Sequence, residues 1–374
     1  MKVISAEILE YSRRLDGRSW NPVSRWTERR APLVVLHSDG GETGIGEGWS
    51  QQAQIGDGLA ALVGCVDSSV VGRTFTGEDA IDALAARRSD ASWPMAAAAS
   101  AVDIALWDLL ARSRGEPVWR TLGGRSDRVR VYASGGLYRD GDGLDELRAE
   151  IAGHLRAGFR DVKIKVGGQP LVLDIERIRV ARAAIGADAA LWVDAVNQLS
   201  AADAIAHAGA YRDAGATALQ APVPFEDIAT MAALTRDVLP VVAAESAFAA
   251  REFEALLHGD AVGYLQFNVG LCGGLSGASA LAGAAAARAV PVTPQVHATA
   301  VLQAAALHFG AARAITHTVE YHRFHDHLAY LLPAAARTVR EGVVALGNAP
   351  GLGLMAPALG AQPDGSVLRL HRTL

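Results

Sequence analysis

A length of 374 residues, half of them hydrophobic and a fifth charged, allows one large domain and a smaller one. A formal net charge of -5 and a pI of about 6.1, with basic residues scattered along the chain, argue against nucleic acid and anionic membranes as partners. Cys65 and Cys272 are far apart and give neither a disulfide framework nor a metal-finger spacing. Without a signal-peptide pattern or an apolar run long enough to span a bilayer, we expect a soluble, cytoplasmic protein.

The first third of the chain predicts a small α+β domain. Apolar patterning predicts strands over residues 2–11 and 31–38 and helices over residues 78–88 and 95–113. The polar loop between the two strands contains Trp20 and Trp26. Such residues in a loop act either as structural supports or as ligand contacts, and the sequence leaves both interpretations open.

From about residue 130, short apolar strands alternate with helical stretches. The strands are expected over residues 129–134, 161–166, 191–196, 218–223, 240–245, 264–269, 290–296 and 316–321, with helices centred near residues 150, 179, 206, 231, 254, 281 and 305. Eight evenly spaced units predict an α/β fold of the parallel (β/α)8, TIM-like type, with a doubly wound open sheet as the alternative. We expect a capping domain at residues 1–125, the barrel at 126–337, and a C-terminal segment at 338–374 that returns to the capping domain.

The segment 161–166 carries two lysines on one strand. Lys163 and Lys165 alternate with apolar residues, so both point to the same face of the strand. Two neighbouring ammonium groups repel each other, which pushes one lysine toward the neutral amine that a general base requires. The alternative is an edge strand with two solvated lysines.

Polar residues recur at the ends of the predicted barrel strands, where the active sites of such barrels lie. In chain order they are Lys163, Lys165, Asp194, Gln220, Glu245, Asn268, Gln295 and Glu320. Each residue by itself is an ordinary loop contact. Together they would converge over a single barrel mouth, which predicts a site there.

The chain resembles the enolase superfamily in its mandelate racemase and muconate lactonizing enzyme-like group. The similarity covers nearly the whole chain and rests on these segments: 101–108, Gly115-Glu116-Pro117, Lys163-Ile164-Lys165, Val193-Asp194, Ala244-Glu245-Ser246, Gly273-Gly274 and Pro350-Gly351-Leu352-Gly353. Within the group, the chain looks most like sugar-acid lactone cycloisomerases and acid-sugar dehydratases. The resemblance also implies a homo-oligomer.

The resemblance implies a mechanism and a metal. A base removes the proton next to the carboxylate of a small substrate, and Mg²⁺ stabilises the resulting enediolate. Carried over by position, Lys165 is the base and Lys163 its neighbour, while Glu320 falls on an acid that binds the substrate carboxylate or enediolate. Asp194, Gln220 and Glu245 fall on the three metal positions. Loops around residues 20–26 and 49–54 would close over the mouth.

Three positions depart from the family pattern. Gln220 replaces an acidic metal ligand, so we expect Mg²⁺ to bind weakly if it binds at all. Asn268 and Gln295 replace an Asp and His pair that commonly serves as a second base, which argues against a two-base racemase. His297 lies two residues beyond Gln295 and shares its face only if the strand extends that far; otherwise it is a loop residue.

Two hypotheses remain. The first is an isomerase or lyase that uses Lys165 for cycloisomerisation or β-elimination of a small carboxylate such as a sugar acid or lactone. Its substrate contacts would come from Trp20, Trp26, Asn268, Gln295 and His297. The second is a non-catalytic or metal-free carboxylate-binding homologue. Retention of both lysines, Asp194 and Glu245 favours the enzyme.

Overall fold

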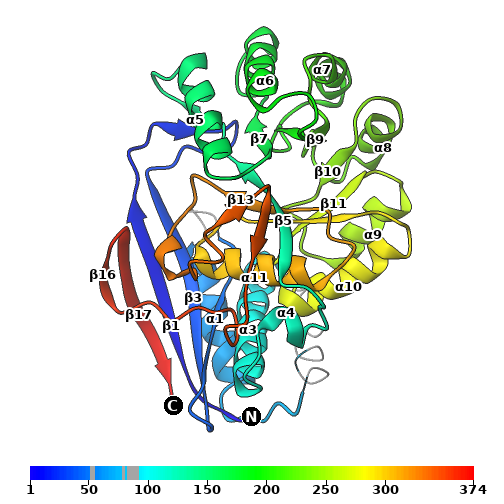
Figure 1. Cartoon of the computed structure of the whole chain (residues 1–374). Helices are drawn as coiled ribbons and strands as arrows, with labels where there is room; N and C mark the ends of the chain where they lie inside the picture. The colour runs from blue at the N-terminus through cyan, green and yellow to red at the C-terminus, as the bar shows by residue number, and fades with distance from the viewer. Residues whose placement is uncertain (51–54, 78–80, 82–91) are drawn as a thin grey trace.

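The computed structural model describes residues 1–50, 55–77, 81 and 92–374. An antiparallel sheet in the order β16-β17-β1-β3-β4 lies along one side of the barrel, and both chain termini lie at the same end of the molecule (Figure 1). Its strands are β1 (Val3–Arg14), β3 (Glu28–Ser38), β4 (Thr43–Glu47), β16 (Gly360–Gln362) and β17 (Gly365–Thr373). The expected strands over residues 2–11 and 31–38 are thus confirmed. The expected helix over residues 78–88 lies almost wholly outside the described residues.

Two helices, α1 (Ile55–Ser69) and α3 (Trp93–Ser113), cover this sheet. The glycines of β4 allow α3 to approach closely. A Cβ atom on Gly46 would lie 1.9 Å from the carbonyl oxygen of Ala101, and one on Gly44 would lie 2.2 Å from that of Ala105. Any larger side chain would therefore separate the helix from the strand.

Helix α3 corrects the expectation that no apolar stretch is long enough to cross a bilayer. By length and composition α3 could do so, but 89% of its most apolar window is buried inside the protein. Its apolar residues contact β4 on one side and α10 (Gly274–Ala286) on another. The high apolar content of α3 is thus that of a core helix surrounded by protein.

The expected barrel is confirmed. Parallel pairing runs in the order β5-β7-β8-β9-β10-β11-β12, β13 pairs with β5, and a bridge between Val292 and Thr316 closes the ring. These strands are β5 (Arg128–Ser134), β7 (Asp161–Lys165), β8 (Leu191–Asp194), β9 (Ala218–Gln220), β10 (Val241–Ala243), β11 (Tyr264–Asn268), β12 (Val292–Gln295) and β13 (Val319–His322). Each of the seven expected helices is also present: α5 (Leu144–Arg156), α6 (Leu171–Ile185), α7 (Ala201–Asp213), α8 (Ile228–Asp237), α9 (Ala250–His258), α10 and α11 (Ala300–Ala312).

Short elements tie the two parts together. Strand β17 pairs with β1, whereas β14 (Val339–Arg340) and β15 (Val343–Ala345) extend the barrel sheet next to β5. The C-terminal segment therefore contributes to both sheets. Strands β2 (Ser19–Trp20) and β6 (Tyr138–Arg139) join the loop after β1 to the loop after β5. The domain boundaries themselves remain a prediction.

A buried carboxylate fixes the capping sheet to the barrel. Glu47, at the end of β4, accepts hydrogen bonds from the backbone nitrogens of Thr299 and Leu302 and from the Thr299 hydroxyl at the start of α11. A carboxylate at a helix N-terminus satisfies backbone N–H groups that lack intrahelical partners and interacts favourably with the helix dipole. This contact sets the position of the cap over the barrel mouth.

Candidate active site

The two lysines of β7 point into the barrel. Strand β7 pairs with β5 on one side and with β8 on the other, so the edge-strand interpretation is wrong. Lys163 is 1% exposed and Lys165 is 6% exposed. Because side chains alternate along a strand, Val162 and Ile164 face the surrounding helices while the lysines share the interior face.

Carboxylates surround the lysine pair. Asp194, the last residue of β8, is opposite Lys165 in the strand register, and its Oδ2 atom accepts from Lys165 Nζ at 2.5 Å and from Lys163 Nζ at 2.7 Å. Glu320 Oε1 lies 3.1 Å from Lys163 Nζ. The other oxygen of Glu320 accepts a hydrogen bond from the backbone nitrogen of Val296 at 2.8 Å. Four groups from three strands thus form one buried ion-pair cluster.

This cluster reverses the expected charge state of Lys163. Burial lowers the pKa of its amine, but the negative charges of Asp194, Glu320 and Glu245 outweigh burial and raise that pKa above its ordinary value. Lys163 therefore remains an ammonium ion, contrary to a simple repulsion argument. Burial also opposes ionisation of Asp194, but the two lysines lower its pKa below the usual range. Lys165 pairs with one carboxylate among the residues that the structure describes, and it is the more exposed of the two lysines.

Three oxygen-bearing side chains lie on successive strand ends, as expected for a metal site. Asp194 ends β8, Gln220 ends β9, and Glu245 follows β10. Gln220 Nε2 donates to Glu245 Oε2 at 2.7 Å, while Gln220 Oε1 is buried without a hydrogen-bond partner among the described residues. Burial and the negative charge of Asp194 raise the pKa of Glu245.

These features fit a divalent cation held by few charges. Carboxylate and amide oxygens are the donors that Mg²⁺ and Ca²⁺ take, and an unpaired amide oxygen beside a carboxylate of raised pKa is satisfied by a cation. Gln220 stands at the middle of the three positions, and no group of three His, Cys, Asp or Glu side chains in the described part of the chain is arranged to hold a metal.

The opposite wall of the barrel is neutral. Asn268 at the end of β11 donates from Nδ2 to Oε1 of Gln295, at the end of β12, over 2.5 Å. Asn268 Oδ1 accepts from the backbone nitrogen of Gly270. Asn268 is fully buried and does not line the cavity, whereas Gln295 does. An amide pair cannot exchange a proton near neutral pH, so this wall offers no second base.

A cavity of about 750 Å³ opens above the cluster. Besides Lys163 and Lys165, its lining includes Trp26, Gln295 and His297, as predicted, and Glu245 from the candidate metal site. Asp194, Gln220 and Glu320 lie beneath the lining and are fully buried. Trp49 also lines the cavity, but residues 51–54 of the second expected loop lie outside the described residues.

Trp20 does not line this cavity, which corrects its predicted role as a substrate contact. Its ring stacks on Tyr138 at 4.6 Å between centroids, and its Nε1 donates to Asp140. Both rings line a second cavity, of about 720 Å³, which residues of α5 and α6 also border. Trp20 is therefore a structural support for the loop, and Trp26 is the tryptophan that faces the mouth.

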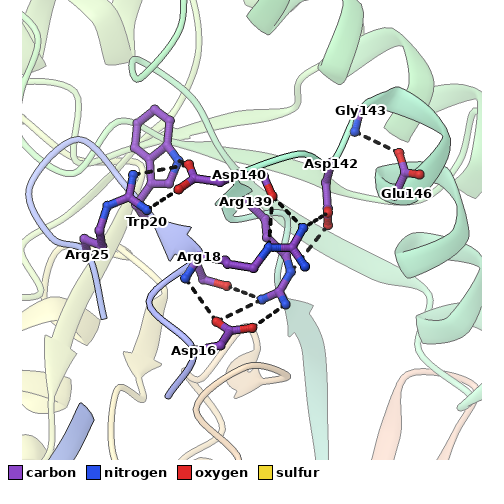
Figure 2. A network of polar contacts seen from close by, with 10 residues as sticks. Asp16, Arg18, Trp20, Arg25, Arg139, Asp140, Asp142, Gly143 and Glu146 are labelled. Atoms are coloured by element: carbon purple, nitrogen blue, oxygen red, sulfur yellow. Dashed lines mark hydrogen bonds and ion pairs between the residues drawn. The ribbon is translucent and has the colours of Figure 1, made fainter. Parts of the chain in front are cut away.

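A network of ion pairs holds that loop to the barrel (Figure 2). Arg25 bonds both carboxylate oxygens of Asp140, and Arg18 donates to the Asp140 backbone and to the Asp142 side chain. Arg139 reaches back to Asp16. These partners lie at the surface, where each pair contributes little to stability. Together they set the path of the segment that brings Asn21, Arg25 and Trp26 to the cavity above the lysine pair.

Further residues line or support the cavity besides the candidate substrate contacts. Arg29 is 1% exposed and donates to the backbone oxygens of Ser50 and His297, so it supports both walls of the mouth. His322 lines the cavity from β13. Its position two residues after Glu320 is a strand-period signal that could have identified it. His325 also lines the cavity but follows the strand, where no periodicity applies.

Comparison with known proteins agrees with this geometry. A family model described as "Enolase C-terminal domain-like" matches residues 146–356, and a model of the "Mandelate racemase / muconate lactonizing enzyme, N-terminal domain" matches residues 14–123. The D-galactarolactone cycloisomerase of Agrobacterium fabrum is 28% identical over 368 residues, which cover 95% of this chain and 96% of that protein. The arabinonate dehydratase of Saccharolobus solfataricus is 29% identical over 214 residues, 57% of each protein.

Among solved structures, the L-talarate/galactarate dehydratase of Salmonella typhimurium, liganded with Mg and L-lyxarohydroxamate, has the same fold. The TM-score is 0.85 at 23% identity, and the match covers 95% of this chain and 91% of that chain. The two family models match the part of the chain that forms most of the capping domain and the part that forms most of the barrel. The chain therefore belongs to the enolase superfamily, in the group of mandelate racemase and muconate lactonizing enzyme.

Proposed function

We propose that this chain removes the proton α to the carboxylate of a small polyhydroxy acid or its lactone, with Lys165 Nζ as the base. The observation that carries the proposal is the buried cluster of Lys163, Lys165, Asp194 and Glu320 beneath a cavity of about 750 Å³. Of its two amines, Lys165 has fewer carboxylate partners and more exposure to the cavity. It is therefore the better placed to exchange a proton with a bound ligand.

Lys163 has a different role. Its ammonium group is held by Asp194 and Glu320 and keeps its proton, so it supplies a fixed positive charge beside the reacting carbon. A proton next to a carboxylate is barely acidic, and its removal needs such charge where the enediolate forms. Glu320 cannot swing away because Val296 also holds it.

Asp194, Gln220 and Glu245 would hold a Mg²⁺ ion. When bound, that ion supplies further positive charge for the substrate carboxylate and the developing enediolate. The buried, unpaired Gln220 Oε1 supports this assignment. With two carboxylates instead of three, the site would bind the ion more weakly than an all-acidic one.

The neutral Asn268–Gln295 wall limits the chemistry to one face. Because neither of these two amides can act as a base, a proton removed by Lys165 returns to the same face or is passed to a leaving group in a syn elimination. Both outcomes suit the cycloisomerisation or dehydration that the names of its relatives describe. We therefore propose a cycloisomerase or dehydratase of sugar acids and not a two-base racemase.

Exchange of the substrate α-proton tests the proposal. When the wild-type protein is incubated with D-galactarolactone and MgCl₂ in D₂O, the lactone should incorporate deuterium at its α-carbon, which NMR detects. Lys165→Met replaces the amine by an apolar chain of similar length, and we expect a loss of about 10²- to 10⁴-fold, the usual contribution of a general base. Unchanged thermal unfolding would show that the variant is folded.

Two results would count against the base assignment. One is substantial exchange in Lys165→Met, and the other is deuterium incorporated with inversion at the α-carbon. The exchange measurement on the wild-type protein also distinguishes an enzyme from a non-catalytic carboxylate binder, because a binder would bind the lactone without exchanging its α-proton.

A further inference from the structure

His322 occupies a place in the site that the proposed reaction does not use. It ends β13, two residues beyond Glu320, so its side chain shares the interior face of that strand with the carboxylate. The side chain is 5% exposed and lines the same cavity as Lys163 and Lys165. A ligand lying against the lysine pair is therefore bordered by this imidazole.

The backbone assigns the tautomer of His322. Its Nδ1 atom accepts hydrogen bonds from the backbone nitrogens of Phe324 at 3.2 Å and His325 at 3.1 Å. Backbone N–H groups can only donate, so Nδ1 carries the lone pair and the proton of the neutral ring is on Nε2. Burial and the charge of Lys163 hold the pKa of His322 well below its ordinary value, so the ring is neutral at pH 7.

The Nε2–H group of His322 has no hydrogen-bond partner among the described residues. An N–H group inside a cavity that donates no hydrogen bond to the protein must find an acceptor in water or in a ligand, because an unmade bond is costly. The two bonds at Nδ1 fix the ring, so this donor is held in one direction before any ligand arrives. Preorganisation of this kind favours binding.

Neighbouring imidazoles hold the ring in place. The His325 ring packs on the His322 ring at 4.4 Å between centroids. Arg13 lies 3.3 Å from His327 Nδ1 and can only donate, so the proton of His327 is on Nε2 and faces His325 Nδ1 at 3.4 Å. The hydrogen bonds from Arg13 to His325 thus run in one direction and keep this wall neutral but rich in N–H donors.

We propose that His322 determines substrate specificity by donating its Nε2–H hydrogen bond to an oxygen atom of a polyhydroxy acid. This inference rests on the proposed function and adds the residue that would recognise oxygen-rich substrates. A substrate ammonium group at this place would meet a donor instead of an acceptor. It would also meet the cations that outnumber the acids in the cavity lining, namely Arg25, Arg29, Lys163 and Lys165 against Glu28 and Glu245.

Two substitutions separate recognition from a structural role. In His322→Asn the side-chain oxygen takes the place of Nδ1 and can keep the two backbone hydrogen bonds, while the distal donor is lost. In His322→Gln the terminal NH₂ group takes the place of Nε2–H, while the backbone acceptor is lost. His308→Asn is the matched control, because His308 is a buried histidine of α11 outside the cavity lining.

The probe is D-galactarate, titrated calorimetrically into each variant in a Lys165→Met background so that no turnover occurs. We expect His322→Asn to weaken binding about tenfold or more and His322→Gln to stay within about threefold of the parent, since a hydrogen bond to a charged or polar ligand contributes on this scale. The His308→Asn control should bind like the parent. The dipeptide L-Ala-L-Glu, which carries an ammonium group, should bind more weakly than galactarate.

Three results would overturn the proposal: equal binding by the parent and His322→Asn, a larger loss in His322→Gln than in His322→Asn, or no binding of galactarate by the parent. A loss of α-proton chemistry would not mimic any of them, because these titrations need no reaction. Conversely, normal galactarate recognition together with exchange that survives Lys165→Met would refute the base and leave the His322 inference standing.

Discussion

Acidification below pH 6.5 should destabilise this protein, because four of its histidines are buried as neutral rings. His308, His322, His325 and His327 are each at most 5% exposed. Burial lowers the pKa of all four, to about 3 for His308 and about 2 for His327. Unfolding returns each ring to a pKa of about 6.5.

Positively charged groups and other imidazoles near His322, His325 and His327 lower the pKa values of these three histidines further. Arg29 and the neighbouring imidazoles face His325, Arg13 and Arg29 face His327, and Lys163 faces His322. All of these groups disfavour another positive charge. His308 differs, since its Nδ1 accepts from the backbone nitrogen of Trp119 and burial is what keeps it neutral.

The sign and size of the effect follow from proton binding. Below pH 6.5 the unfolded chain binds more protons than the folded protein, so stability present above that pH is lost as the pH falls. Each ring removes about 1 kcal/mol between pH 6.5 and 5.5, and four remove about 4 kcal/mol. That is a large part of a typical stability of about 5–15 kcal/mol.

Urea unfolding followed by tryptophan fluorescence at pH 7.5, 6.5 and 5.5 measures this loss. His308→Asn keeps an acceptor for Trp119 but cannot take up a proton, so its loss should be smaller by about a quarter. The exposed His258→Asn serves as the control and should behave like the wild type. A free energy of unfolding that stays constant from pH 7.5 to 5.5, or an unchanged slope in His308→Asn, would refute the reasoning.

Three further predictions concern metal binding, backbone strain and the cap. Gln220→Glu adds a charge to the candidate metal site and should tighten Mg²⁺ on the order of tenfold by calorimetry; unchanged affinity would mean that residue 220 does not face the ion. Val196 is a β-branched residue at a φ of 54°, so Val196→Asn should raise the free energy of unfolding by about 1 kcal/mol, measured by thermal unfolding. Asn197→Val, at a φ of 60°, should lower it, and equal melting temperatures would exclude strain there. Glu47→Ala leaves three hydrogen-bond donors of Thr299 and Leu302 unpaired and should cost about 3–5 kcal/mol in urea unfolding, with a smaller loss in Glu47→Gln, which keeps an acceptor oxygen; equal losses would refute a contribution from neutral hydrogen bonds and assign the whole effect to the charge.

Local patterns in the chain determined the barrel and the candidate residues. Apolar runs and their spacing placed the strands and helices, because burial on both faces of a parallel strand leaves a continuous apolar signal. Alternation along residues 161–166 put Lys163 and Lys165 on one face, and strand ends marked Asp194, Glu245 and Glu320. These features depend on neighbours in sequence, so they can be predicted without the fold.

Only the tertiary structure decided how those residues act. Lys163 keeps its proton because Glu320 arrives from β13 and Asp194 from β8, and charge balance depends on distances that sequence does not contain. Trp20 faces away from the mouth because the β2–β6 pairing turns its ring onto Tyr138. The Nε2–H group of His322 has a fixed direction only in the folded chain, because the backbone nitrogens of Phe324 and His325 donate to its Nδ1 atom there. Periodicity is a local property, whereas electrostatics and hydrogen-bond direction are set by residues brought together from distant parts of the chain.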